Sequence, residues 1–138
     1  MDGRRVLVVD DEVHFRYFLK VLLEKAGYAV KTARNGIEAL ETLRSWRPDA
    51  ITLDVMMPGQ SGLVFYGAVR RSDDWKAIPV VMLSAVPVSV REHALAALAL
   101  TQGALPAPAA CLEKPCAPEA LLAVVNRLVS ESTTDRSA

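Results

Sequence analysis

VLVVDD, the stretch from Val6 to Asp11, is a short apolar run that ends in two adjacent acidic residues. Runs of this length that are apolar and rich in β-branched residues are typical of strands buried on both faces of a parallel sheet. Three further runs of this kind follow along the chain, and each also stops at a polar residue. They are residues 50–53 before Asp54, residues 80–83 before Ser84, and residues 110–113 before Lys114.

The segments between these runs have apolar residues at spacings of three and four, which predicts amphipathic helices. The first helix is expected to end at Gly27, and residues 28–33 are predicted to form a further strand. Residues 89–92 fit a capping box that opens a fourth helix, and Pro118 suits the first turn of a fifth. The expected core positions of the first three helices are Phe15, Phe18, Leu19, Leu22, Leu23, Ala26, Ile37, Leu40, Leu43, Trp46, Leu63, Phe65, Tyr66 and Val69; those of the fifth are Leu121, Leu122, Val125, Leu128 and Val129.

Strand and helix thus alternate about five times, which predicts an α/β fold. Right-handed crossovers then give a doubly wound, five-stranded parallel sheet with five helices distributed over both faces. Ligands of such sheets bind outside the carboxyl ends of the strands. We therefore expect one cleft to collect the polar residues at those ends. These are Asp10, Asp11, Asp54, Ser84 and Lys114.

The composition of the chain restricts its possible domain organisation, binding partners and location. A chain of 138 residues that is 51% hydrophobic fits one domain with a single core, and its sixteen basic and sixteen acidic residues balance. No net field attracts nucleic acid, so direct nucleic-acid binding is not expected. The apolar run before Asp10 is too short for a signal-peptide core or a spanning helix, so we expect a cytoplasmic protein without membrane association.

The C-terminal third holds three less regular features. Residues 103–110 are rich in alanine and proline, which predicts an extended surface loop because proline lacks an amide donor. Cys111 and Cys116 have no histidine nearby and are interpreted as reduced thiols without a metal. We expect the folded domain to span residues 1–130, and the polar residues 131–138 to fray or to begin a linker.

The expected cleft has the composition of a phosphate site. Three clustered carboxylates repel one another and are usually held by a divalent cation with oxygen ligands, here Mg²⁺ or Mn²⁺. Asp54, alone at the end of a central strand, is suited to act as a nucleophile toward phosphorus. The ammonium of Lys114 and the hydroxyl of Ser84 would then neutralise and bind the phosphoryl oxygens. The sequence therefore predicts a site that makes and holds an acyl phosphate.

The same residues carry a resemblance to a known family. The matching positions are Asp10-Asp11 after a strand, Asp54 with Met57-Pro58 and Gly62 after it, Ser84-Ala85, and Lys114-Pro115. In order and approximate spacing they resemble the motif set of the response regulator receiver domain of two-component signalling. The resemblance spans about residues 4–130 and implies a flavodoxin-like sheet with strand order 2-1-3-4-5.

The resemblance also implies roles for individual residues. Asp54 would be the phosphoacceptor, Asp11 a direct magnesium ligand, and Asp10 an acidic partner that often acts through water. The backbone carbonyl of Met56 would be a further ligand. The phosphate-binding switch residues would be Ser84 and Lys114. Such a domain is no conventional enzyme, although it assists its own phosphorylation and slow dephosphorylation.

Partners follow from the same resemblance. The implied phosphoryl donor is a phosphohistidine on a sensor histidine kinase or a histidine phosphotransfer protein. No effector segment is recognisable after the last helix, so we expect the phosphorylated chain, if complete, to dock onto a downstream effector protein. The family also makes a phosphorylation-dependent homodimer possible, through the fourth helix, fifth strand and fifth helix.

The chain departs from the family at two places, and a third feature concerns hydrolysis. Cys111 occupies the position of the switch aromatic, three residues before Lys114, which puts the usual aromatic coupling in doubt. The segment between Ser84 and Lys114 is longer than usual, which suggests an output surface reshaped for a particular partner. Met56 and Val86 flank the path of the attacking water; since both are apolar, neither side chain orients that water, and we predict slow self-dephosphorylation.

Two other functions share parts of this pattern. A haloacid-dehalogenase-like phosphatase also combines an aspartyl nucleophile with magnesium, but it needs an acid where this chain has Met56. A pseudo-receiver, acting as a constitutive interaction module, is the alternative that Cys111 supports. Taken alone, Asp10-Asp11 would be read as a helix N-cap, and Arg70-Arg71 as a solvated helix end.

Overall fold

The computed structural model describes residues 4–54, 61–84, 108–113 and 117–137. Five strands and four helices lie within these ranges. The strands are β1 (Arg5–Val9), β2 (Ala29–Ala33), β3 (Ala50–Asp54), β4 (Val80–Ser84) and β5 (Ala110–Glu113). The helices are α1 (Val13–Lys25), α2 (Gly36–Ser45), α3 (Ser61–Arg71) and α5 (Pro118–Ser137). The predicted fourth helix and most of the alanine- and proline-rich segment lie outside the described residues.

All five strands are parallel and pair in the order β2-β1-β3-β4-β5. This order confirms the flavodoxin-like topology expected from the sequence. The chain moves outward from β1 to β2, then crosses back to β3 on the other side of β1, so the direction of winding reverses between β1 and β3. Ligands of open α/β sheets bind at such a reversal, outside the carboxyl ends of the strands.

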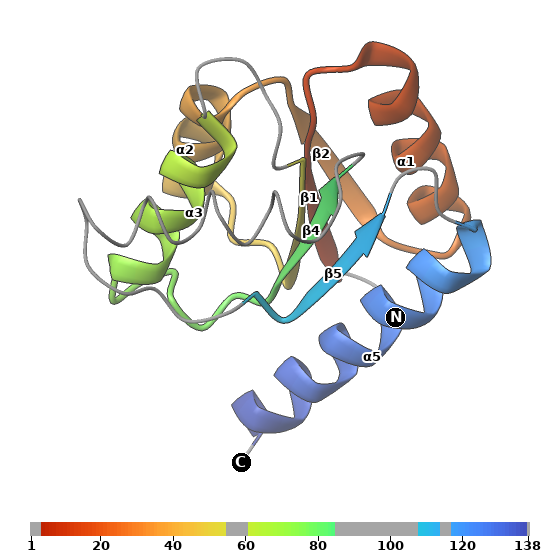
Figure 1. Ribbon diagram of the computed structural model, residues 1–138. Coiled ribbons are helices and arrows are strands. Elements are labelled where there is room, and N and C mark those ends of the chain that lie inside the picture. The colour runs from red at the N-terminus through yellow and green to blue at the C-terminus, as the bar shows by residue number, and fades with distance from the viewer. Residues whose placement is uncertain (1–3, 55–60, 85–107, 114–116, 138) are drawn as a thin grey trace.

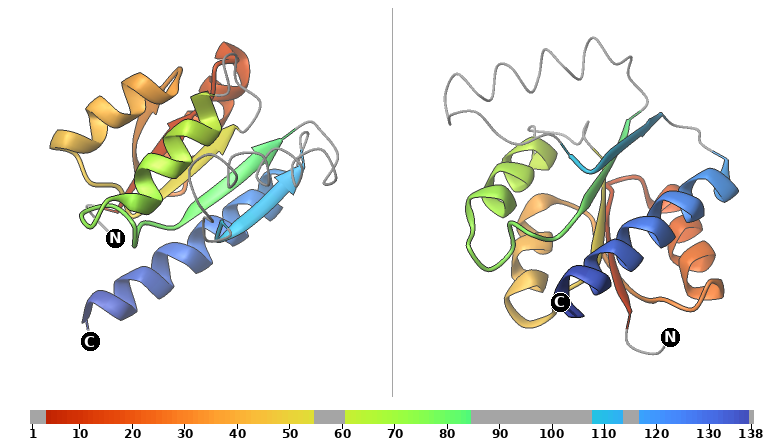
Figure 2. Two further views of the ribbon diagram at one scale, coloured as in Figure 1. Left: turned by 60° about the vertical axis from the view of Figure 1, so that its left-hand side comes forward. Right: turned by 90° about the horizontal axis from the view of Figure 1, so that it is seen from below.

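Helices cover both faces of the sheet in a three-layer arrangement (Figures 1 and 2). Helices α2 and α3 pack on one face, and α1 and α5 on the other. Alternate strand residues supply each side of the core because successive side chains of a strand point to opposite faces. Leu7 and Val9 face α2 and α3, whereas Val6 and Val8 face α1 and α5.

The central strands are buried throughout, as the apolar runs predicted. From Val6 to Val9 and along the whole of β3, every residue is buried. The two edge strands β2 and β5 instead alternate between more and less exposed positions, because successive side chains point to opposite faces of the sheet and the two faces are covered unequally there. Their weaker apolar pattern in the sequence has this cause.

Side-chain caps fix where α1 and α2 begin. Glu12 is the N-cap of α1, and its carboxylate accepts hydrogen bonds from the amides of His14 and Phe15 at 3.1 and 2.6 Å. Asn35 caps α2 by accepting from the amide of Glu38 at 2.9 Å. After α1, Gly27 adopts a φ of 101°, a left-handed conformation that glycine takes without strain.

Three of the predicted core positions are wrong. Ile37 is 72% exposed, Phe18 is 38% exposed and Ala26 is also an exposed residue, so none of them belongs to the core. Ala39 and Leu43 line the buried face of α2, which is turned away from Ile37. Helix α5 continues to Ser137, beyond residue 130, where we expected the domain to end; the domain boundary itself stays a prediction.

Candidate functional site

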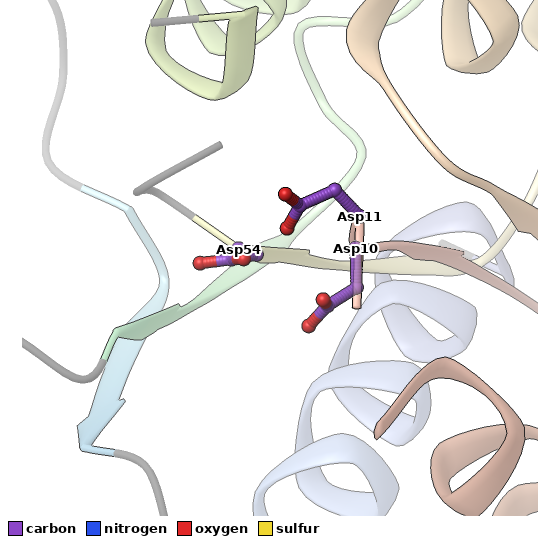
Figure 3. Close-up of side chains that lie close together, drawn as sticks. All are labelled: Asp10, Asp11 and Asp54. Carbon is purple, nitrogen blue, oxygen red and sulfur yellow. The ribbon is translucent and has the colours of Figure 1, made fainter. Parts of the chain in front are cut away.

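The acidic residues selected from the sequence lie at the ends of two neighbouring central strands. In the pairing of β1 with β3, Val9 is opposite Leu53. Asp10 follows Val9 and Asp54 follows Leu53, so the two acids stand side by side at the carboxyl edge of the sheet. Asp11 follows Asp10 and completes the group (Figure 3).

The three carboxylates form one cluster. One carboxylate oxygen from each of Asp10, Asp11 and Asp54 lies within 4.8 Å of the other two. Asp10 is 1% exposed and Asp54 is 6% exposed, whereas Asp11 is an exposed residue. The cluster is therefore buried on its sheet side and open to solvent at Asp11.

Neither acid of the pair serves as the helix cap. Glu12 is the N-cap of α1, so the interpretation of Asp10-Asp11 as a helix N-cap is wrong. Asp10 instead belongs to the end of the sheet: its amide donates to the carbonyl of Ala33 on β2 at 3.0 Å. Its Oδ1 accepts from the amide of Glu12 at 2.8 Å, which turns the chain from β1 into α1.

This donor set fits a divalent cation. Carboxylate oxygens are the hard ligands that Mg²⁺ takes, and Mg²⁺ usually keeps several waters rather than a closed protein cage. Three acids this close repel one another when all are ionised, and a cation between them removes that repulsion. A cluster with two buried acids and one exposed acid leaves room for such waters on the open side.

The structure describes only some of the other predicted site residues. Ser84 is the last residue of β4, two strands from Asp10 in the sheet, so its backbone lies at the same edge. Cys111 lies on β5 opposite Met82, carries no disulfide and is exposed. Met56, Val86, Lys114 and Cys116 lie outside the described residues.

The structure also adds a residue that the sequence analysis did not select. Arg16 on α1 donates from its Nη1 to the backbone carbonyl of Asp10 at 2.8 Å. Its position six residues after Asp10 places it on the second turn of the helix that Glu12 opens. A polar residue at that spacing is common on helices, so the sequence alone did not distinguish it.

Helix α1, which begins just after the acidic pair, has exposed apolar residues. Val13 is 56% exposed and Tyr17 is 67% exposed, and both follow the acidic pair within two turns of the helix. A shallow groove of about 410 Å³ runs along the same helix. It is lined by Tyr17, Phe18, Val21, Leu22 and Lys25.

No helix in the described part of the chain has both the length and the apolar character needed to cross a membrane.

Comparison with known sequences gives one consistent result. Residues 6–126 match the family described as the response regulator receiver domain. The chain is 45% identical over 97 residues to protein-glutamate methylesterase/protein-glutamine glutaminase 3 of Rhodospirillum rubrum. This match covers 70% of this chain and 25% of that protein. It is 39% identical over 134 residues to the response regulator MprA of Mycolicibacterium vanbaalenii, covering 97% of this chain and 54% of that one.

Solved structures agree with the sequence comparison. The signal receiver domain of a signal transduction histidine kinase from Syntrophus aciditrophicus superimposes with a TM-score of 0.77 at 31% identity. The match covers 94% of this chain and 92% of that domain. The chain thus spans nearly all of an isolated receiver domain, but only a quarter to about half of the two curated relatives.

Proposed function

Because this chain belongs to the response regulator receiver domain family, we propose that it is a phosphorylation-dependent signalling switch that accepts a phosphoryl group on Asp54. The observation that carries the proposal is the approach of Asp10, Asp11 and Asp54 within 4.8 Å at the carboxyl edge of the sheet. Residues far apart in sequence are brought together there by strand order alone. The haloacid-dehalogenase alternative loses its basis once the family is known.

Asp54 is the proposed nucleophile. Its carboxylate ends β3, and although 6% exposed it belongs to a cluster that opens to solvent at Asp11. In the proposed step a carboxylate oxygen of Asp54 attacks the phosphorus of a phosphohistidine. A P–O bond forms as the P–N bond breaks, and the departing imidazole nitrogen takes a proton from water. The product is an acyl phosphate on Asp54.

The remaining residues are proposed to hold the metal ion and to bind the phosphoryl oxygens. Asp10 and Asp11 would hold magnesium together with Asp54, and the backbone carbonyl of Met56 is a further proposed ligand. Bound magnesium would offset the negative charge of the phosphoryl oxygens. Ser84 and Lys114 are proposed to bind the other phosphoryl oxygens, because both follow strands that end at this edge.

The donor and the effector are proposed to be proteins. A phosphohistidine on a sensor histidine kinase or phosphotransfer protein must approach the edge where Asp54 lies. Val13 and Tyr17 are exposed apolar residues of α1, the helix that begins just after the acidic pair, and they offer a protein donor a contact surface that a small molecule does not need. We place this exchange in the cytoplasm, where such kinases carry their phosphohistidine.

Cys111 favours a second candidate function. It fills the position at which the family has an aromatic residue, and its side chain is exposed on β5. An exposed thiol is smaller than an aromatic ring and cannot make the same inward rotation when Asp54 is phosphorylated. The second candidate is therefore a pseudo-receiver, which binds its partner equally well in either state.

The test is the intact mass of the protein after incubation with magnesium and acetyl phosphate. A single phosphoryl increment that requires magnesium and is absent from Asp54→Asn supports the switch. Partner binding before and after phosphorylation then separates the two candidates, since only a switch changes its affinity. Absence of any increment with acetyl phosphate and with a cognate kinase would favour the pseudo-receiver.

A further inference from the structure

The peptide that joins Asp10 to Asp11 is held from helix α1. Arg16 is half-buried, and its Nη1 donates to the carbonyl oxygen of Asp10 at 2.8 Å. A peptide unit is planar, so fixing this oxygen also fixes the amide nitrogen and the Cα of Asp11. Arg16 therefore determines the point from which the exposed carboxylate of Asp11 extends into the cluster.

The other two polar groups of Asp10 are held by backbone atoms. Its amide bonds to Ala33 on β2, and its carboxylate accepts from the amide of Glu12. The bond from Arg16 to the carbonyl oxygen is made by a side chain. A substitution of Arg16 removes it without changing any proposed metal ligand.

The charge of the Arg16 guanidinium also affects Glu38, an acid outside the cluster. Glu38 on α2 accepts from the amide and the Nε of Arg34 at 3.0 and 2.7 Å. The bond from the Arg34 amide is the main reason why the pKa of Glu38 lies below its ordinary value, and the charge of Arg16 lowers this pKa further. The charge of Arg16 thus also acts on an acid that is not part of the cluster.

We propose that Arg16 is a positioning residue for the metal site, because it fixes the backbone from which Asp11 reaches the cation. The inference rests on the proposed function, since it concerns the magnesium site of the same cluster. Partners that orient metal ligands in this way change metal affinity about 10-fold to 100-fold when removed.

The charge of Arg16 acts in the opposite direction from its hydrogen bond. A guanidinium near the cluster repels a cation, so removing the charge alone would strengthen metal binding. Removing the bond frees the Asp10-Asp11 peptide and weakens metal binding. The sign of the change therefore separates a positioning role from a purely electrostatic one.

The experiment is a titration with Mn²⁺ followed by electron paramagnetic resonance, which counts free metal and requires no phosphorylation. The variants are Arg16→Met, which keeps an unbranched side chain without the donors, and Arg16→Lys, which keeps the charge and a donor. Arg34→Met is the matched control, because it removes a guanidinium that bonds Glu38 instead of Asp10. Circular dichroism without metal shows whether each variant is folded, and Arg16→Gln replaces Arg16→Met if that variant is not.

We expect Arg16→Met to bind Mn²⁺ about 10-fold more weakly than wild type, with most of the affinity restored in Arg16→Lys. Arg34→Met should bind at least as tightly as wild type. Equal or tighter binding by Arg16→Met would overturn the positioning role and leave the metal site intact. If wild type itself binds no Mn²⁺, the proposed metal site fails, and the role of Arg16 fails with it.

Discussion

Asp10 and Asp54 extend two neighbouring parallel strands in the same register, each following one member of the pair Val9 and Leu53. Parallel pairing thus places two acids side by side, and both are almost fully buried. Their burial at the strand ends, together with the exposed Asp11, concentrates negative charge at the point where the winding of the sheet reverses. A cation is the simplest way to relieve that concentration.

Replacing Asp11 with asparagine should therefore stabilise the metal-free protein. Asp11→Asn removes one charge from the cluster at nearly constant shape, and we expect a gain of roughly 0.5 kcal/mol, as for exposed charge pairs. Thermal unfolding with and without Mg²⁺ measures this. Magnesium should raise the melting temperature of wild type more than that of Asp11→Asn, because ligands stabilise the state that binds them. An equal magnesium response in both proteins would contradict a role for Asp11 as a ligand.

The exposed apolar residues of α1 should matter for a protein donor only. Tyr17→Ser removes an exposed ring and should leave the fold intact, since surface substitutions usually change stability by about 0.5 kcal/mol or less. We expect slower phosphorylation by the cognate kinase and an unchanged rate with acetyl phosphate. Ile37→Ser is the control, because Ile37 is equally exposed but lies on α2. Equal rates with the kinase for wild type and Tyr17→Ser would exclude this surface from donor docking.

The acyl phosphate should be long-lived. Met56 and Val86 carry no group that orients or deprotonates water, so hydrolysis lacks the general-base help that is worth about 100-fold or more in other active sites. We expect a lifetime of minutes or longer, measured by loss of the phosphoryl mass increment. Met56→Glu should shorten it. A wild-type lifetime of seconds would show that another group activates the water.

Alkaline pH should weaken the fold through Tyr28. Burial raises the pKa of Tyr28 above its ordinary value of 10.0, with Arg4 lowering it and Asp49 raising it to smaller extents. The unfolded chain therefore loses this proton first, and the stabilisation is complete below pH 10.0 and is lost as the pH rises through the folded pKa. Urea unfolding of wild type and Tyr28→Phe at several pH values measures the difference.

Tyr28→Phe should show a smaller loss of stability above pH 10.0 than wild type. At neutral pH it should cost about 1 kcal/mol, because the hydroxyl of Tyr28 donates to Oδ1 of Asn126 on α5 and that acceptor loses its donor. Identical pH dependence in the two proteins would assign the alkaline transition to other groups. Tyr66, whose pKa burial also raises, is the first of these.

The sequence predicted a parallel sheet and the meeting of Asp10 with Asp54 at its edge because both depend on strong patterns. Apolar runs that end in a polar residue mark buried parallel strands, and the carboxyl ends of such strands meet at one edge. Asp10 and Asp54 follow their strands directly, so no side-chain detail was needed to bring them together. The resemblance to receiver domains then supplied the strand order that the structure confirms.

The exposure and the hydrogen bonds of individual side chains were harder to predict. Ile37 is apolar and lies at helical spacing from Leu40, yet the helix presents Ala39 and Leu43 to the sheet and leaves Ile37 exposed. Arg70 was read as part of a solvated helix end, but its guanidinium donates to the carbonyls of Lys76 and Ile78. Such bonds depend on how a loop folds back, which no spacing rule contains. The bond from Arg16 to Asp10 escaped prediction for the same reason.

The most direct test of the account locates the phosphoryl group itself. Borohydride reduces an aspartyl phosphate to homoserine, and peptide mass mapping of the phosphorylated and reduced protein identifies the modified position. The account predicts homoserine at position 54 alone, and only in protein that was incubated with magnesium and a phosphoryl donor. Homoserine at position 10 or 11, or none in protein that carries the phosphoryl mass increment, would contradict Asp54 as the phosphoacceptor.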